Sequence, residues 1–170
     1  MRTLTANALR LEVPRGSPNP QAGALSHATY IGGDSMIRDV LGPALRARFA
    51  SRGITAGTAR GSVAVFPAMH PAVGDLSIRD DGDHATISIG NITNHQVNPH
   101  DADMSEKERT QWVTQAVMEF LERLFADRVL LLKGKTSSWG RIQMLDNDEP
   151  IPTISKDADA FLWSGPVQQG

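Results

Sequence analysis

Residues 105–125 read SEKERTQWVTQAVMEFLERLF, and this stretch predicts the strongest element of the fold. Ser105 and Glu108 match a capping box, in which the serine oxygen accepts an amide hydrogen bond and the glutamate reaches back to the serine backbone. The apolar residues then recur every three or four positions, which places them on one face of a helix. They are Trp112, Val113, Ala116, Val117, Phe120, Leu121, Leu124 and Phe125. We expect this face to pack on a sheet.

An antiparallel hairpin is predicted before this helix. Apolar and polar residues alternate in two short runs within 76–89, as in strands that are buried on one face. Asp81-Gly82 between the runs is typical of a two-residue turn. Such a turn places Ile78 opposite Ala85, so apolar side chains meet on one face of the hairpin and polar side chains on the other.

A second amphipathic helix is predicted nearer the N-terminus. Apolar residues recur at helical spacing from Met36 to Phe49, Asp34 can cap the start, and Gly53 can close the end. Gly42-Pro43 lies inside this pattern, and proline lacks the backbone donor that a helix interior uses. The helix therefore either kinks at this point or begins again with Pro43 in its first turn.

These elements indicate an α+β fold. A strand is expected at residues 63–66 and a second hairpin at 129–132 and 141–145, which gives an antiparallel sheet of four to five strands with the two main helices packed on one face. The core domain is expected to span 34–146. The proline- and glycine-rich segment 1–33 is expected to be an irregular arm, and 147–170 a mostly irregular tail packed on or near the core, ending in an aromatic anchor.

Composition and charge narrow the classes of function. The chain has 170 residues and a formal net charge of −2, with its basic residues scattered, which disfavours nucleic-acid binding. No run approaches the roughly 18 apolar residues of a membrane span, and the N-terminus lacks the apolar segment of a signal peptide. The chain has no cysteine, so disulfides and thiolate chemistry are excluded. We expect a cytoplasmic protein without membrane contact.

Histidines and acidic residues suggest one possible metal site. His95 and His100 are expected to share a polar loop with Asp101, and His70 is placed where it could reach the same end of the sheet. These four residues could hold a divalent metal whose bound water becomes a nucleophile, which would make the protein a metal-dependent hydrolase. Their spacing matches no standard ligand signature, and otherwise no cofactor is expected.

A short motif resembles another class of hydrolase. Gly33-Asp34-Ser35 resembles the nucleophile block of the GDS-type serine hydrolases, and Asp81 with His84 supplies the Asp-x-x-His that those enzymes use to orient and deprotonate the serine. The resemblance covers seven residues. A helix cap and a hairpin turn explain the same residues, so no catalytic residue is assigned.

The leading hypothesis is a non-enzymatic protein-binding domain, such as an inhibitor or immunity-type partner of another bacterial protein. Acidic loops are expected to face a basic surface on the partner, and loop tryptophans are expected to supply an apolar anchor. The binding residues in this hypothesis are Asp80, Asp81, Asp83, Asp101, Asp103, Trp139 and Trp163. A further alternative is a structural subunit of a homo- or hetero-oligomer, in which the terminal segments are exchanged between copies.

Overall fold

The structure is a computed structural model that describes residues 36–99, 103–136, 139–146 and 150–168. Every described residue belongs to one compact unit, Gly32–Gly170. The C-terminal tail therefore lies in the same unit as the expected core domain. The expected N-terminal arm and the helix cap at Asp34 lie outside the described residues.

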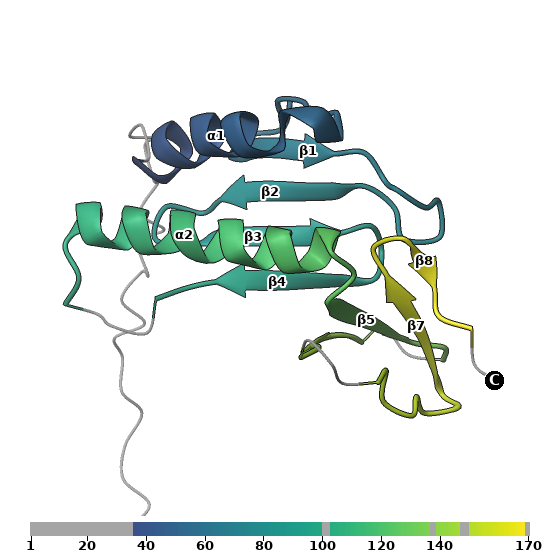
Figure 1. The fold of residues 1–170 in the computed structure, drawn as a ribbon. Helices are drawn as coiled ribbons and strands as arrows, with labels where there is room; N and C mark the ends of the chain where they lie inside the picture. Colours follow the sequence, from purple (N-terminus) through teal and green to yellow (C-terminus); the bar gives the residue numbers. More distant parts are fainter. Residues whose placement is uncertain (1–35, 100–102, 137–138, 147–149, 169–170) are drawn as a thin grey trace, which may run out of the picture. The chain divides into compact units, whose positions relative to one another are not determined.

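The described part of the chain contains two helices, one 3-10 turn and eight strands (Figure 1). In chain order they are α1 (Met36–Phe49), η1 (Ala50–Arg52), β1 (Ser62–Phe66), β2 (Leu76–Asp80), β3 (Ala85–Ile89), β4 (Thr93–Val97), α2 (Glu106–Phe125), β5 (Val129–Gly134), β6 (Gly140–Met144), β7 (Ala158–Leu162) and β8 (Gly165–Pro166). The strands form two antiparallel four-stranded sheets, so the expected α+β fold is confirmed. The second sheet was not expected.

Helix α1 is a single helix with Pro43 in its interior, so it does not restart at that residue. The chain continues into η1 and ends the helical segment at Gly53, whose φ of 69° is the left-handed conformation that glycine adopts without a steric penalty. The prediction that Gly53 closes this segment is confirmed. Arg48 near the end of α1 forms an ion pair with Glu122 of α2 at 2.8 Å, which links the two helices.

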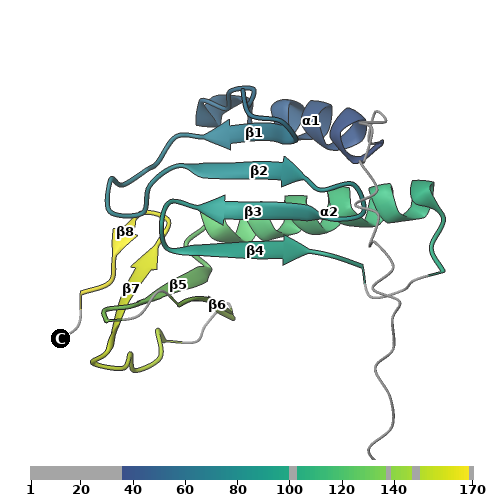
Figure 2. The ribbon, with the colours of Figure 1, turned by 180° about the vertical axis from the view of Figure 1, so that it is seen from behind.

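The first sheet has the strand order β1-β2-β3-β4, and both helices cover the same face of it (Figure 1). Seen from behind, the other face of the sheet has no described helix over it (Figure 2). The buried side chains of the strands point toward the helices, as the alternation of side chains along a strand requires. Among those that are almost fully buried are Phe66, Leu76, Ile78, Ile87 and Ile89.

The β2–β3 hairpin forms, but with a register two residues away from the predicted one. Ile78 lies opposite Ile87 rather than Ala85, and Ala85 lies opposite Asp80. The central residues of the turn are Gly82 and Asp83, because the backbone N–H of Asp81 already donates to the carbonyl of His84 at 3.0 Å. Gly82 has φ 98° and occupies the first central position, where glycine is favoured in a type II′ turn.

The second sheet has the order β6-β5-β7-β8. The expected second hairpin is confirmed as β5 and β6. Instead of an irregular tail, the C-terminal segment supplies β7 and β8, with β7 paired antiparallel to β5. Trp163 follows β7 and is only 2% exposed, in contact with Phe125 at a ring-centroid distance of 5.5 Å. This side chain joins the second sheet to the core beneath α2.

Candidate functional site

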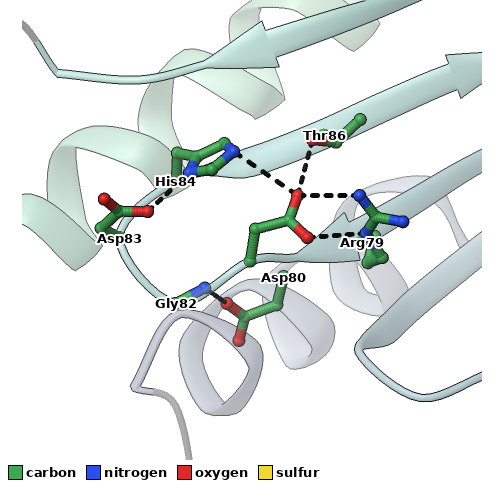
Figure 3. A network of polar contacts seen from close by, with 7 residues as sticks. Arg79, Asp80, Gly82, Asp83, His84 and Thr86 are labelled. Carbon is green, nitrogen blue, oxygen red and sulfur yellow. Dashed lines mark hydrogen bonds and ion pairs between the residues drawn. The ribbon is translucent and has the colours of Figure 1, made fainter. Parts of the chain in front are cut away.

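The acidic residues of the turn between β2 and β3 make polar contacts with one another's neighbours (Figure 3). The carboxylate of Asp81 accepts hydrogen bonds from the Thr86 hydroxyl at 2.6 Å and from Nε of Arg79 at 2.7 Å. Burial alone would raise the pKa of Asp81, but these hydrogen bonds outweigh it and hold the pKa below its usual value. The carboxylate of Asp81 therefore makes its contacts within the turn.

Asp80 has a structural role at the start of α1. Its side chain accepts hydrogen bonds from the backbone N–H of Arg38 at 3.1 Å and of Gly82 at 2.8 Å, and the residue is 8% exposed. A carboxylate beside the first turn of a helix satisfies an amide that has no partner within the helix and is attracted to the positive end of the helix dipole. Asp80, which was expected from the sequence to face a partner, is thus buried within the domain.

His84 lies between two carboxylates. Its Nδ1 is 2.6 Å from Asp83 Oδ1, and its Nε2 is 3.5 Å from Asp81 Oδ2. The hydrogen bond with His84 holds the pKa of Asp83 below its usual value. In an Asp-His pair that activates a serine, one ring nitrogen faces the hydroxyl. Both nitrogens of His84 face carboxylates here, and Gly33-Asp34-Ser35 lies outside the described residues, so the geometry of this turn does not support the serine hydrolase resemblance.

Three further acidic residues were expected to face a partner. The side chain of Asp83 is 64% exposed and Asp103 is also exposed, whereas Asp101 lies outside the described residues. Asp103 has an interaction of its own within the chain. Of the five predicted acidic residues, only Asp83 and Asp103 are described and exposed.

The two described histidines of the expected metal site have other surroundings. His95 lies on β4, not in a loop, and its ring stacks on Phe120 with the centroids 4.7 Å apart. The Nδ1 of His70 accepts a hydrogen bond from the backbone N–H of Ala72 at 3.1 Å. No group of three or more potential ligands is found among the described residues, and His100 and Asp101 lie outside them.

The two tryptophans of the expected interface differ in exposure. Trp163, expected as a docking anchor, is buried in the core. Trp139 is 44% exposed and lies before β6, beside a cleft that Leu132 and Ile154 also line. Trp112 on α2, which the sequence pattern assigned to the buried helix face, is in fact 39% exposed.

A groove of about 570 Å³ lies beside Trp112, between strand β4 and helix α2. We call it the β4–α2 groove. Trp112 and Met144, which are 39% and 41% exposed, give it apolar walls, and Glu119 and Arg123 of α2 add one charge of each sign. The full lining is His95, Gln96, Val97, Asn98, Trp112, Ala116, Glu119, Phe120, Arg123 and Met144.

The backbone of β4 also borders this groove. The direction in which the N–H and C=O groups of β4 point follows from the hydrogen bonds that β3 makes with β2. The N–H of Asp81 donates to the carbonyl of His84, and the N–H of Gly90 donates to the carbonyl of Asp75 at 2.8 Å. Bonds in an antiparallel pair fall on alternate residues, so the even-numbered residues of β3 bond to β2. Its odd-numbered residues therefore bond to β4.

The residues of β4 that bond to β3 are consequently Thr93, His95 and Val97. The backbone N–H and C=O groups of Asn94 and Gln96 point away from the sheet, at its outer edge. Within the part of the chain that the structure describes, no hydrogen bond to the backbone of Gln96 is found. We call Asn94–Asn98 the β4 edge.

The opposite edge of the same sheet is covered. Thr55 pairs with Val65 of β1 through two backbone hydrogen bonds of 2.9 Å, N–H to carbonyl in each direction. Proteins commonly shield an edge strand in this way, because unpaired backbone groups can accept a strand from another chain. No described strand is hydrogen-bonded to the β4 edge, although β6 and β5 lie close to β4, and the edge borders the β4–α2 groove, which has both polar and apolar walls.

No protein-family model, curated protein or solved structure matches this chain. Among the described residues, no helix is long and apolar enough to span a membrane.

Proposed function

We propose that this chain is a protein-binding domain, and that it binds an extended polypeptide segment along the β4 edge. The observation that carries the proposal is that outward backbone groups of Asn94 and Gln96 run beside the β4–α2 groove. In strand addition, backbone hydrogen bonds supply affinity and pockets for alternate side chains supply specificity. The β4 edge and its groove offer both.

The groove favours a segment with apolar side chains at alternate positions. Side chains of an added strand that point to the helix side would meet Trp112, Ala116 and Met144. Tryptophan and methionine are enriched in protein interfaces, and the small Ala116 side chain leaves space between the larger ones. The other side chains of the added strand would lie on the opposite, polar face of the sheet.

The proposed class of function is the one that the sequence predicts, but the docking surface is the β4 edge and its groove instead of the acidic loops. An inhibitor or immunity-type role and a cytoplasmic location remain compatible with strand addition. Asp83 and Asp103 have exposed carboxylates that a basic surface on the partner could contact. Asp80 and Asp81 make their contacts within the domain. The apolar contact is assigned to Trp112 in place of Trp163.

A photo-crosslinking amino acid on α2 tests the proposal in cells that make the full chain. Glu119 lines the groove, whereas Glu122, on the same helix, forms an ion pair with Arg48 of α1. A crosslinker at 119 should give an adduct with a polypeptide, and a crosslinker at the matched position 122 should not. The substitution Gln96→Pro should abolish the adduct, because proline removes the outward N–H.

Equal adducts from positions 119 and 122 would contradict the proposal. So would an adduct at 119 that survives Gln96→Pro in a protein that keeps its circular dichroism spectrum, because binding would then not use the β4 edge.

A further inference from the structure

We propose that a cleft on the second sheet binds a small organic carboxylate with an apolar body. The cleft has a volume of about 400 Å³ and shares no lining residue with the β4–α2 groove. Strands β5 and β6 supply its floor, and we call it the β5–β6 cleft. The proposed ligand is independent of the polypeptide that we assign to the β4 edge.

The floor of the β5–β6 cleft is the face of the second sheet that points away from the main core. Leu130 of β5 lies opposite Gln143 of β6. Leu132 lies opposite Arg141. Residues directly opposite one another in an antiparallel pair place their side chains on the same face. Leu131, between the two leucines, points to the other face and belongs to the main core.

Apolar side chains form most of this cleft. Leu130 is fully buried, and Leu132 and Ile154 pack against the same small cluster of apolar residues. Trp139, which is 44% exposed, and Pro152 also line the cleft. Sites for small molecules are concave and mostly apolar, with volumes of about 300–1,000 Å³. The size and the lining of the β5–β6 cleft are therefore suited to a small molecule with an apolar body.

Arg141 carries the only charge among the described residues that line the cleft. Its guanidinium forms no ion pair with any residue that the structure describes. Arg48 and Arg79, by contrast, each form an ion pair with a carboxylate of the domain. A guanidinium binds a carboxylate through two parallel hydrogen bonds. The charge of Arg141 at an apolar cleft is therefore complementary to the carboxylate of a ligand.

Two neutral polar side chains of the lining can add to this contact. Gln143 and Thr153 line the cleft, and within the described part of the chain neither side chain has a hydrogen-bond partner. An amide and a hydroxyl can each donate to a carboxylate, whose two oxygens accept about four hydrogen bonds. A cationic ligand would instead be repelled by Arg141. A few polar groups around an apolar floor fix the orientation of a small ligand.

Isothermal titration calorimetry of the full chain with naphthalene carboxylate tests the site. Its aromatic ring can pack on the exposed indole of Trp139. We expect saturable binding to one site. Naphthalene carboxamide has the same ring and no charge, so it should bind about tenfold more weakly, because it lacks the charge-assisted hydrogen bonds to Arg141. Decanoate in a parallel titration distinguishes an aliphatic acid from an aromatic one.

Variants of the lining residues locate the binding. Arg141→Met keeps a long side chain without the charge, so it should weaken binding of the carboxylate about tenfold and leave binding of the carboxamide unchanged. Trp139→Ala should weaken binding of both. Two matched controls lie elsewhere: Arg46→Met on the exposed face of α1, and Trp112→Ala at the β4–α2 groove. Both controls should bind the carboxylate as the wild type does.

The inference is overturned if the wild type binds neither naphthalene carboxylate nor decanoate. Equal affinity for the carboxylate and the carboxamide would also overturn it. So would undiminished carboxylate binding by an Arg141→Met variant that keeps its circular dichroism spectrum. The crosslinker at Glu119 tests polypeptide binding at a different surface, so either proposal can fail without the other.

Discussion

The imidazole ring of His95 on β4 stacks on the phenyl ring of Phe120 on α2, with the centroids 4.7 Å apart and the planes inclined by 26°. This contact fixes the edge strand beneath the helix that forms the other wall of the β4–α2 groove. It also removes part of the imidazole from water. Burial lowers the pKa of His95 below 6.5, because desolvation disfavours the charged ring.

The first prediction concerns the pH dependence of stability. His95 binds a proton more readily in the unfolded chain than in the folded chain. Above pH 6.5 this difference does not reduce the free energy of unfolding. As the pH falls from 6.5 through the lower folded pKa, protonation favours the unfolded chain and the free energy of unfolding decreases. His95→Phe should retain the ring stack and reduce the loss of unfolding free energy in that range. Urea denaturation over a pH series checks this, and an unchanged slope in the variant would contradict it.

The second prediction compares two acidic residues of one turn. Asp80→Ala leaves the amides of Arg38 and Gly82 without their acceptor, which should cost about 1–3 kcal/mol of unfolding free energy. Asp83→Ala removes an exposed carboxylate and should cost less than about 1 kcal/mol. Chemical denaturation of both variants measures the difference. Equal costs would mean that Asp80 does not stabilise the start of α1.

The third prediction concerns the ionisation of Asp81. Thr86→Val removes the hydroxyl that donates to this carboxylate at 2.6 Å, so the pKa of Asp81 should rise. Asp81 then contributes less to the free energy of unfolding above pH 3.8, the pKa in the unfolded chain. The free energy of unfolding therefore decreases less as the pH falls through the folded pKa of Asp81. An NMR titration of the side-chain carboxyl measures the shift. Thr93→Val is a control on β4 and should leave the pKa of Asp81 unchanged.

The fourth prediction separates the two tryptophans that the sequence treats alike. Trp163→Ala should cost about 3–5 kcal/mol of unfolding free energy, because it empties a buried site beside Phe125. Trp139→Ala, at an exposed position, should change stability by less than about 0.5 kcal/mol. Thermal and urea unfolding provide the comparison, and a small effect of Trp163→Ala would contradict its place in the core.

Local patterns predicted the elements whose signals are contained in neighbouring residues. The capping box of α2 is confirmed, with the Ser105 side chain accepting from the backbone of Glu108 and the Glu108 side chain accepting from that of Ser105. The hairpin register was missed because Asp81-Gly82 and Gly82-Asp83 are both acceptable turns. Asp80 decides between them, since its side chain holds Gly82 and also caps α1. That long-range contact leaves no mark in the local sequence.

The candidate site was missed for a related reason. Strand β4 reads TNHQV, which lacks the alternating apolar residues that identify a strand, so its histidine was assigned to a loop. Trp112 fits the apolar period of α2, but it is 39% exposed. The signal that was available is Pro99 after a short β-compatible run, which marks the end of an edge strand.

Residue-by-residue amide hydrogen exchange, measured by NMR with and without the polypeptide that the crosslinker at position 119 captures, tests the central claim most directly. The amide of His95, bonded to β3, should be protected in both samples. The amides of Asn94 and Gln96 should exchange rapidly in the chain alone and become protected when the polypeptide is present. Protection of Gln96 in the chain alone would show that the edge is covered within one chain, and rapid exchange in the presence of the polypeptide would show that the polypeptide does not bind there.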